Sequence, residues 1–130
     1  MNIAIIGVGS WGSAIGLVLS ENKNCNITMY NYDSYYDNES SFKYLQKSKI
    51  PNDINIKSDF NDILKNDIIF IALPTQHIHS TLKKLDKNQL INKQAIWVNC
   101  SKGFDLNKED IFSSTLIDDF DIKKENFIIL

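Results

Sequence analysis

At 130 residues, with 43% hydrophobic and 23% charged residues, the chain has the size and composition of a single soluble globular domain. A net charge of −2 gives no electrostatic case for a nucleic acid or an anionic membrane surface as partner. No apolar run approaches the length of a membrane span, and no secretory signal precedes the first apolar residues. The two cysteines, Cys25 and Cys100, have neither metal-ligand nor C-x-x-C spacing, so we expect a reduced, cytoplasmic protein without a bound metal.

The first predicted element is an apolar strand at residues 3–6 that leads directly into a Gly-x-Gly-x-x-Gly motif. A predicted helix at residues 13–19 follows the last glycine. In this context the motif indicates dinucleotide binding rather than an ordinary glycine-rich loop. Gly7 would allow the tight turn, Gly9 would let the backbone approach a pyrophosphate, and Gly12 would let the helix pack closely on the sheet. Backbone N–H groups and the positive end of the helix dipole would then hold the phosphates.

Two further strand patterns follow, at residues 27–30 and 54–56. A polar break separates the first of them from the preceding helix. Between the two strands, residues 31–48 form a polar stretch dotted with aromatic residues, which we expect to contain one helix.

The longest continuous apolar run, at residues 68–73, is preceded by a short predicted helix through residues 62–64. Ser58 or Asp59 is the expected cap of that helix. Because the apolar run does not alternate with polar residues, it predicts a parallel strand that is buried on both faces. Pro74 ends this strand.

An amphipathic helix is predicted next, because Ile78, Leu82 and Leu85 recur at helical spacing on one face. A strand pattern at residues 95–98 follows. It leads into a polar turn at residues 101–103.

The last predicted elements are a helix through Ile111, Phe112 and Leu116 and an apolar strand at residues 127–130. The chain stops within this strand pattern, without a polar tail. We therefore expect residues 1–130 to be a dinucleotide-binding domain from a longer protein.

Strand and helix patterns alternate along the chain, which predicts an α/β fold: a Rossmann-type parallel sheet with right-handed crossovers and helices on both faces. Ligands of such sheets bind beyond the carboxyl ends of the strands. Four segments lie at those ends and are expected to converge on one crevice: residues 7–12, 31–33, 74–77 and 101–103.

Three segments together resemble the N-terminal domain of NAD(P)-dependent glycerol-3-phosphate dehydrogenase: residues 7–14, 71–74 and 101–105. The Ser-Lys-Gly-Phe-Asp sequence of the last segment is the most discriminating, and an aromatic residue after the second glycine also fits the family. The resemblance implies reversible hydride transfer between a nicotinamide and the carbonyl of dihydroxyacetone phosphate. The product, glycerol 3-phosphate, is a precursor of phospholipids.

By the same resemblance, Ser10 and Trp11 contact the dinucleotide, and Lys102 lies near both the nicotinamide and the substrate. A lysine at the carboxyl end of a strand can supply positive charge to a phosphate or a developing alkoxide. Tyr32 and Pro74 complete the expected cofactor-binding residues beside the three glycines. The family carries its proton-transferring lysine in a C-terminal helical domain, which is absent here. We therefore expect no catalytic residue in this segment, and dinucleotide binding without turnover.

The choice between NAD and NADP depends on the end of the second strand. Tyr32 falls where many family members have Arg or His, so the usual cationic group for a 2′-phosphate is missing. All fourteen basic residues of the chain are lysines. Asp33 lies late for a contact with the ribose of NAD and is typical of a turn or cap. We expect NAD rather than NADP, with Tyr32 either stacked on the adenine or covering the surface.

Two other hypotheses stay open from the sequence. A related β-hydroxyacid or ketopantoate-type reductase would share the fold and the glycine motif, although the Ser-Lys-Gly segment argues against it. A non-catalytic nucleotide-binding module, or a truncated relic, would keep the fold without the chemistry. The expected partners are the small-molecule substrate and, for the intact protein, a second copy in a homodimer.

Overall fold

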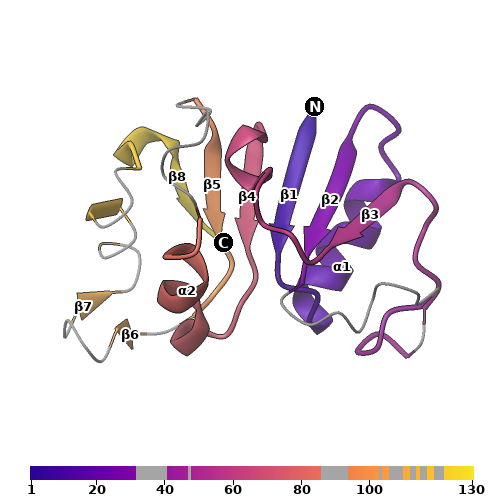
Figure 1. The fold of residues 1–130 in the computed structure, drawn as a ribbon, viewed down its shortest axis with the longest axis horizontal. Coiled ribbons are helices and arrows are strands. Elements are labelled where there is room, and N and C mark those ends of the chain that lie inside the picture. The colour runs from indigo at the N-terminus through magenta and orange to yellow at the C-terminus, as the bar shows by residue number, and fades with distance from the viewer. Residues whose placement is uncertain are drawn as a thin grey trace.

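The computed structural model describes residues 1–31, 41–46, 48–85, 94–102, 104–105, 110–111, 114, 117–118 and 122–130 of the chain. Within them the central feature is a parallel sheet of six strands in the order β3-β2-β1-β4-β5-β8 (Figure 1). In chain order the strands are β1 (Asn2–Ile6), β2 (Asn26–Tyr30), β3 (Ile54–Lys57), β4 (Ile68–Ile71), β5 (Ile96–Asn99) and β8 (Phe127–Ile129). The predicted parallel sheet is confirmed.

Two α-helices connect neighbouring strands of this sheet. Helix α1 (Ser10–Ser20) joins β1 to β2, and helix α2 (Thr75–Leu82) joins β4 to β5. The remaining elements are two 3-10 turns, η2 (Ile63–Lys65) and η3 (Lys124–Asn126), and a separate antiparallel pair, β6 (Phe104–Asp105) and β7 (Asp110–Ile111).

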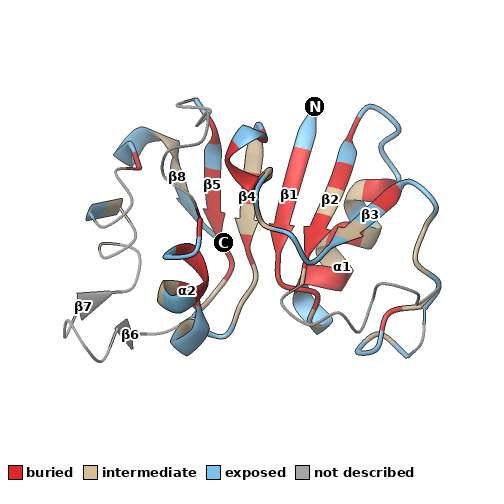
Figure 2. Ribbon diagram, in the orientation of Figure 1, coloured by how far each residue is buried: buried red, intermediate tan, exposed pale blue. Residues whose placement is uncertain are grey.

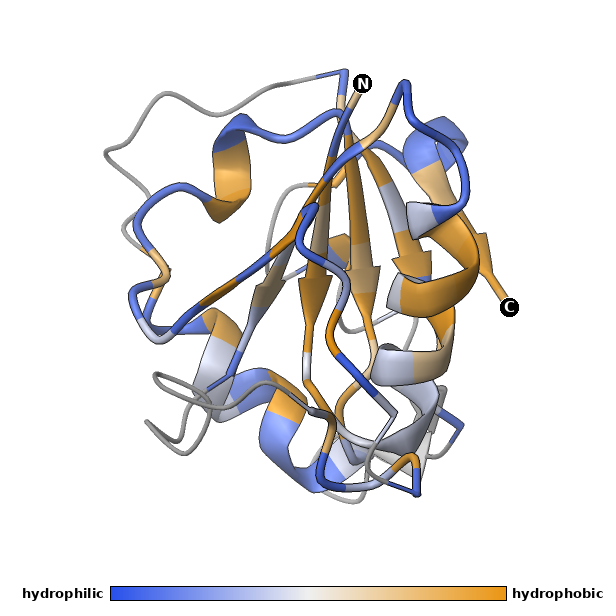
Figure 3. Cartoon of the chain, turned by 90° about the vertical axis from the view of Figure 1, so that its right-hand side faces the viewer, coloured by the Kyte–Doolittle hydropathy of each residue, from blue (hydrophilic) through white to orange (hydrophobic). Residues whose placement is uncertain are grey.

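The core lies on both faces of the sheet, because side chains of each strand point alternately to either side. Ile5 belongs to the cluster against which Ile15 of α1 packs. Ile6 belongs to the opposite cluster, which contains Ile78 and Leu82 of α2. The strands are accordingly buried along much of their length (Figure 2) and hydrophobic when seen from the side (Figure 3). Helices therefore cover both faces, as predicted.

The strand order places a crevice at one end of the sheet. Ile6, at the end of β1, pairs with Tyr30 of β2 on one side and with Ile71 of β4 on the other. The chain thus continues outward in one direction from β1 and in the other from β4. In open parallel sheets this reversal point, beyond the carboxyl ends of the strands, is where ligands bind.

Helix α1 begins earlier than predicted. Its first residue is Ser10 rather than residue 13, and its N-cap is Gly9, whose backbone is extended. The N–H of Ser13 donates to the carbonyl oxygen of Gly9 at 2.9 Å. Gly12 therefore lies inside the first turn of the helix instead of before it.

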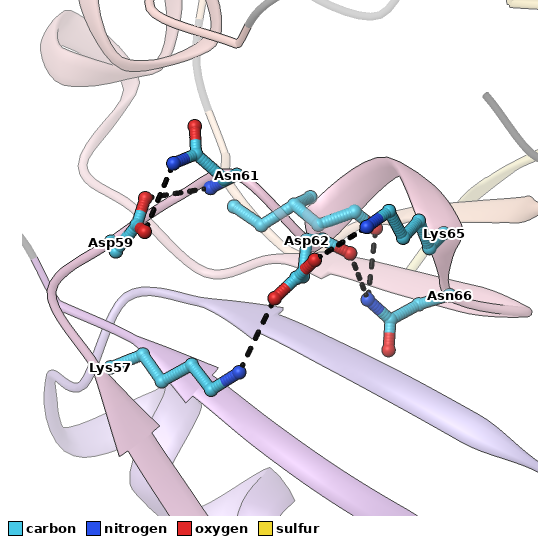
Figure 4. A network of polar contacts seen from close by, with 7 residues as sticks. Lys57, Asp59, Asn61, Asp62, Lys65 and Asn66 are labelled. Atoms are coloured by element: carbon cyan, nitrogen blue, oxygen red, sulfur yellow. Dashed lines mark hydrogen bonds and ion pairs between the residues drawn. The ribbon is translucent and has the colours of Figure 1, made fainter. Parts of the chain in front are cut away.

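The short helix predicted before β4 is only a 3-10 turn, η2, and its expected cap is wrong. The N-cap is Asp62, without a side-chain capping bond, rather than Ser58 or Asp59. The Asp59 carboxylate instead accepts hydrogen bonds from the backbone and side chain of Asn61 (Figure 4). Asn66 closes the turn, because its side-chain amide donates to two of the turn's carbonyl oxygens at 3.0 and 2.9 Å.

The helix predicted through residues 111–116 is only partly supported. Ile111 lies in β7, paired with β6, rather than in a helix. Ser114, Ile117 and Asp118 are helical, while Phe112 and Leu116 lie outside the described residues.

The helix predicted within residues 31–48 is absent from the part of this segment that the structure describes. Residues 43–46 form a turn. Ser41 makes an isolated antiparallel bridge to Lys49 on either side of it. Residues 32–40 and 47 lie outside the described residues.

Candidate functional site

The chain leaves β1 through a turn at Gly7. The φ angle of Gly7 is +109°, a conformation that side chains disfavour. Its N–H donates to the carbonyl oxygen of Tyr30 at 2.9 Å, which ties the turn to the end of β2. A Cβ atom at this position would lie only 2.5 Å from the carbonyl oxygen of Ala72. Both the conformation and the space therefore require glycine, which confirms the predicted role of Gly7 in the turn.

Gly12 allows helix α1 to pack directly on that turn. A Cβ atom on Gly12 would lie 2.0 Å from the carbonyl oxygen of Gly7 and 3.3 Å from the Cβ atom of Ala72. Because the nearest atom belongs to the backbone, it could not move aside without disrupting the turn. The close approach of helix and sheet predicted for Gly12 is confirmed.

Gly9 differs from the other two glycines because it faces open space. A Cβ atom there would meet no heavy atom within 4 Å. As the N-cap of α1, Gly9 provides no side-chain capping bond, and the first turn of the helix contains no acidic residue. The N–H groups that precede Ser13 in the helix have no intrahelical acceptor, and no acidic side chain of the first turn offsets the positive end of the helix dipole. An anion can therefore approach the backbone at Gly9.

A cleft of about 450 Å³ opens beside this turn, between α1, the loop from β4 to α2 and the loop after β5. It is lined by Ser10, Trp11, Ala72, Leu73, Pro74, Thr75, Gln76, Cys100, Ser101 and Lys102. Both apolar and hydrogen-bonding groups line it, and Lys102 is the only charged side chain among these lining residues.

Trp11 forms part of the cleft wall and remains 54% exposed. It lines the cleft together with Cys100, whose thiol donates to the carbonyl oxygen of Val98 at 3.8 Å. Burial raises the pKa of the Cys100 thiol, and the Trp11 side chain only partly opposes this effect. The thiol is therefore protonated at neutral pH and is a poor nucleophile.

The structure brings together most of the residues predicted for the site. Gly7 and Gly9 lie in the turn beside the cleft and Gly12 lies in the first turn of α1, while Ser10, Trp11, Pro74 and Lys102 line the cleft. Three of the four predicted segments thus meet at one end of the sheet. Tyr32 lies outside the described residues, and so do Asp33 and Gly103.

Several lining residues of the cleft were not predicted as individual site residues, among them Cys100 and Thr75, although Thr75 belongs to the predicted segment 74–77. Cys100 was considered only for its redox chemistry, and Thr75 was not assigned a role. The available signal was position, because each residue lies directly beyond a predicted strand of the parallel sheet. Thr75 donates from its hydroxyl to the carbonyl oxygen of Lys102 at 2.7 Å. This contact joins residues that are 27 positions apart in the sequence, so a local sequence pattern could not predict it.

Comparison with known proteins identifies the family. The family model for the N-terminus of NAD-dependent glycerol-3-phosphate dehydrogenase matches residues 2–130. The chain belongs to this family. One relative, a glycerol-3-phosphate dehydrogenase (NAD(P)+) of Orientia tsutsugamushi, is 35% identical over 123 residues, which are 91% of this chain and 37% of the relative. Another, from Fusobacterium nucleatum, is 30% identical over 97% of this chain and 38% of its own length.

Solved structures agree with this fold. A glycerol-3-phosphate dehydrogenase, GPD1, of Saccharomyces cerevisiae superimposes with a TM-score of 0.76 at 21% identity, covering 95% of this chain and 40% of that one. A prephenate dehydrogenase of A. aeolicus gives a TM-score of 0.66 at 14% identity, over 99% of this chain and 40% of the other. The chain thus spans well under half the length of the dehydrogenases that it resembles.

Other features of the described residues add three observations. None of the helices among them has the length and apolar character needed to cross a membrane. In the same part of the chain, no three His, Cys, Asp or Glu side chains gather in a way that could hold a metal ion. Both cysteines are buried and free of disulfide bonds.

Proposed function

We propose that this chain binds the diphosphate of a nicotinamide dinucleotide at the turn formed by residues 7–12. The observation that carries the proposal is the open space at Gly9, next to the start of α1. A diphosphate needs backbone N–H donors and room to reach them, and a helix start with a glycine N-cap offers both. The family membership supports the same ligand.

The remaining part of the dinucleotide would extend into the cleft. Trp11 and Pro74 offer apolar surface to a flat nicotinamide ring, and Ser10 also lines the cleft. A bound nicotinamide would supply or accept the hydride. Lys102, at the end of β5, would provide positive charge for a phosphate group or for an oxygen that becomes negative during reduction.

The proposed substrate pair is dihydroxyacetone phosphate and glycerol 3-phosphate, because the curated relatives carry the name glycerol-3-phosphate dehydrogenase. Relatives are more than twice as long as this chain, and the extra length is where we place the proton-transferring lysine. Residues 1–130 would accordingly bind coenzyme without completing the reaction. For the intact protein we propose a homodimer in the reducing cytoplasm, a location compatible with two free cysteines.

We also propose that NAD is preferred over NADP. A 2′-phosphate is usually bound by arginine, and the chain contains none. Tyr32 stands where family members often carry a cationic residue.

Titration of the purified chain with NADH and NADPH, followed by calorimetry, tests the binding proposal. We expect saturable binding of both coenzymes, with the smaller dissociation constant for NADH. Absence of binding would contradict the proposed function, while tighter NADPH binding would contradict only the coenzyme preference. Adding dihydroxyacetone phosphate to the chain and NADH should produce no oxidation of the coenzyme, and measurable turnover would overturn the proposal that catalysis needs residues found only in the longer relatives.

A further inference from the structure

The two loops that form the cleft are joined by a reciprocal pair of side-chain hydrogen bonds. Thr75, the first residue of α2, donates from Oγ1 to the carbonyl oxygen of Lys102 at 2.7 Å. In the opposite direction, Ser101 donates from Oγ to the carbonyl oxygen of Leu73. Each loop thus supplies one hydroxyl group and one carbonyl group to the other. We call this pair of bonds the hydroxyl clasp.

We propose that the hydroxyl clasp holds Lys102 in position for the diphosphate of a dinucleotide bound at the start of α1, because Ser10 and Lys102 line the same cleft. Thr75 and Ser101 are then positioning residues that act through Lys102. This inference rests on the proposed function, because it assumes that a nicotinamide dinucleotide occupies the cleft. Thr75 and Ser101 would then belong to the site, because they order the loop that carries Lys102.

The hydrogen bonds of the clasp fix the backbone on both sides of Lys102. The N–H of Ser101 donates to the side-chain oxygen of Asn99 at 3.0 Å, and Asn99 is only 3% exposed. The hydroxyl of Ser101 and the carbonyl oxygen of Lys102 are held by the clasp itself. The position of the Lys102 backbone is therefore set by three contacts, although the residue lies in an exposed loop.

The side chain of Lys102 is left available for a ligand. Lys102 is exposed, and no described acidic residue forms an ion pair with it. A lysine side chain has much conformational freedom, which it loses in part when a ligand binds. The total loss of entropy on binding is smaller when the backbone of that lysine is already ordered. The clasp supplies that order.

The two hydroxyl groups themselves are poorly suited to bind an anion directly. The proton of each is donated to a backbone carbonyl oxygen, so each presents only lone pairs toward the cleft. Removal of either hydroxyl should therefore weaken anion binding through Lys102 rather than by loss of a direct contact. This distinction can be measured.

A double-mutant cycle on the complete 130-residue chain tests the proposal, with NADH as the probe and calorimetry as the readout. Thr75→Val removes the hydroxyl and keeps the branched shape, and Lys102→Met removes the charge and keeps much of the length. We expect each single substitution to weaken NADH binding by about fivefold, and the double variant to bind no more weakly than Lys102→Met alone. Thr75→Ser, which retains the hydroxyl, should restore binding.

Ser80→Ala is the matched control. Ser80 lies on the same helix, and its hydroxyl also donates to a backbone carbonyl, that of His77, but at an exposed position outside the cleft lining. This variant should bind NADH like the unsubstituted chain. Circular dichroism would verify folding, and Ser101→Ala would replace Thr75→Val in the same cycle if the latter does not fold.

The outcomes separate this inference from the function on which it rests. If Thr75→Val weakens binding by the same factor with and without Lys102, the threonine acts independently of the lysine and the positioning role is wrong. The same conclusion follows if Thr75→Val leaves NADH binding unchanged. If the unsubstituted chain does not bind NADH at all, the proposed function itself fails, and this inference fails with it.

Discussion

Three glycines within six residues serve different physical purposes, and the differences can be tested one residue at a time. Gly7 is required by its backbone conformation, Gly12 by contact with backbone atoms, and Gly9 by neither. Glycine is therefore needed for folding at positions 7 and 12. At position 9 the fold does not require glycine, and the absence of a side chain leaves space for a ligand.

Substitution of these glycines by alanine should separate folding from binding. Gly12→Ala places a methyl group 2.0 Å from a carbonyl oxygen, so we expect the free energy of unfolding to fall by roughly 2–4 kcal/mol. Gly9→Ala should change stability by less than about 0.5 kcal/mol, yet weaken NADH binding by about tenfold or more. Urea unfolding and calorimetric titration measure the two effects. Normal coenzyme affinity in Gly9→Ala would argue against a diphosphate at this position.

The structural roles of Gly7 and Gly12 were predictable because the strand, motif and helix are contiguous in sequence. The contribution of Thr75 was not, because its hydrogen bond to Lys102 depends on two loops that only the folded sheet brings together. Local pattern identifies a residue's neighbours along the chain but not its partners across a cleft. Contacts between loops are therefore the part of the site that the sequence leaves undetermined.

At the scale of elements, the six strands of the parallel sheet could be located from the sequence because each contains a short run or an alternation of apolar residues. The predicted apolar face of α2 was also correct. Leu85 lies beyond the end of the helix, in a turn that continues it through a hydrogen bond from the Leu85 N–H to the carbonyl oxygen of Leu82, and it is buried. The pair β6 and β7 was missed, because each strand has two residues and too short a pattern to recognise. Ile111 was assigned to a helix for the same reason.

The turn η2 and the end of β2 meet at Tyr30. We expect the free energy of unfolding to fall at alkaline pH because of this residue. Burial raises the pKa of Tyr30 above 10.0, an effect opposed by a hydrogen bond with Asn66 and supported by the charges of Asp62 and Asp59. A raised pKa in the folded state means that the stabilisation is complete below pH 10.0 and is lost as the pH rises through the pKa of the folded protein.

Urea midpoints measured between about pH 8 and about pH 11 would check this prediction. The unsubstituted chain should lose stability more steeply over this range than Tyr30→Phe. Tyr44→Phe, which alters an exposed ring, should behave like the unsubstituted chain. Equal slopes for all three proteins would show that burial of Tyr30 has no such effect.

At the scale of the whole molecule, the edge of the sheet at β8 exposes apolar side chains. Ile128 and Leu130 are 46% and 62% exposed, and Ile96 of the neighbouring strand is also exposed. An apolar edge strand favours pairing with another chain. We therefore expect residues 1–130 to associate as concentration rises and to be less soluble than a full-length relative.

Sedimentation velocity over a range of concentrations measures this association. Ile128→Lys should shift the chain toward monomer, because a charge at the edge opposes pairing. Val18→Lys, at an exposed position on α1, is the matched control and should leave the association unchanged. A chain that stays monomeric at high concentration without any substitution would contradict the prediction.

The account depends most on the anion site at the start of α1, and the backbone amide resonances of residues 9–12 report on it directly. Titration with NADH should shift these resonances in a saturable manner, while the amide of Cys25, near the opposite end of the helix, should remain in place. If the resonances of residues 9–12 do not move at saturating concentrations of either NADH or NADPH, the diphosphate does not bind at this turn and the central claim is wrong.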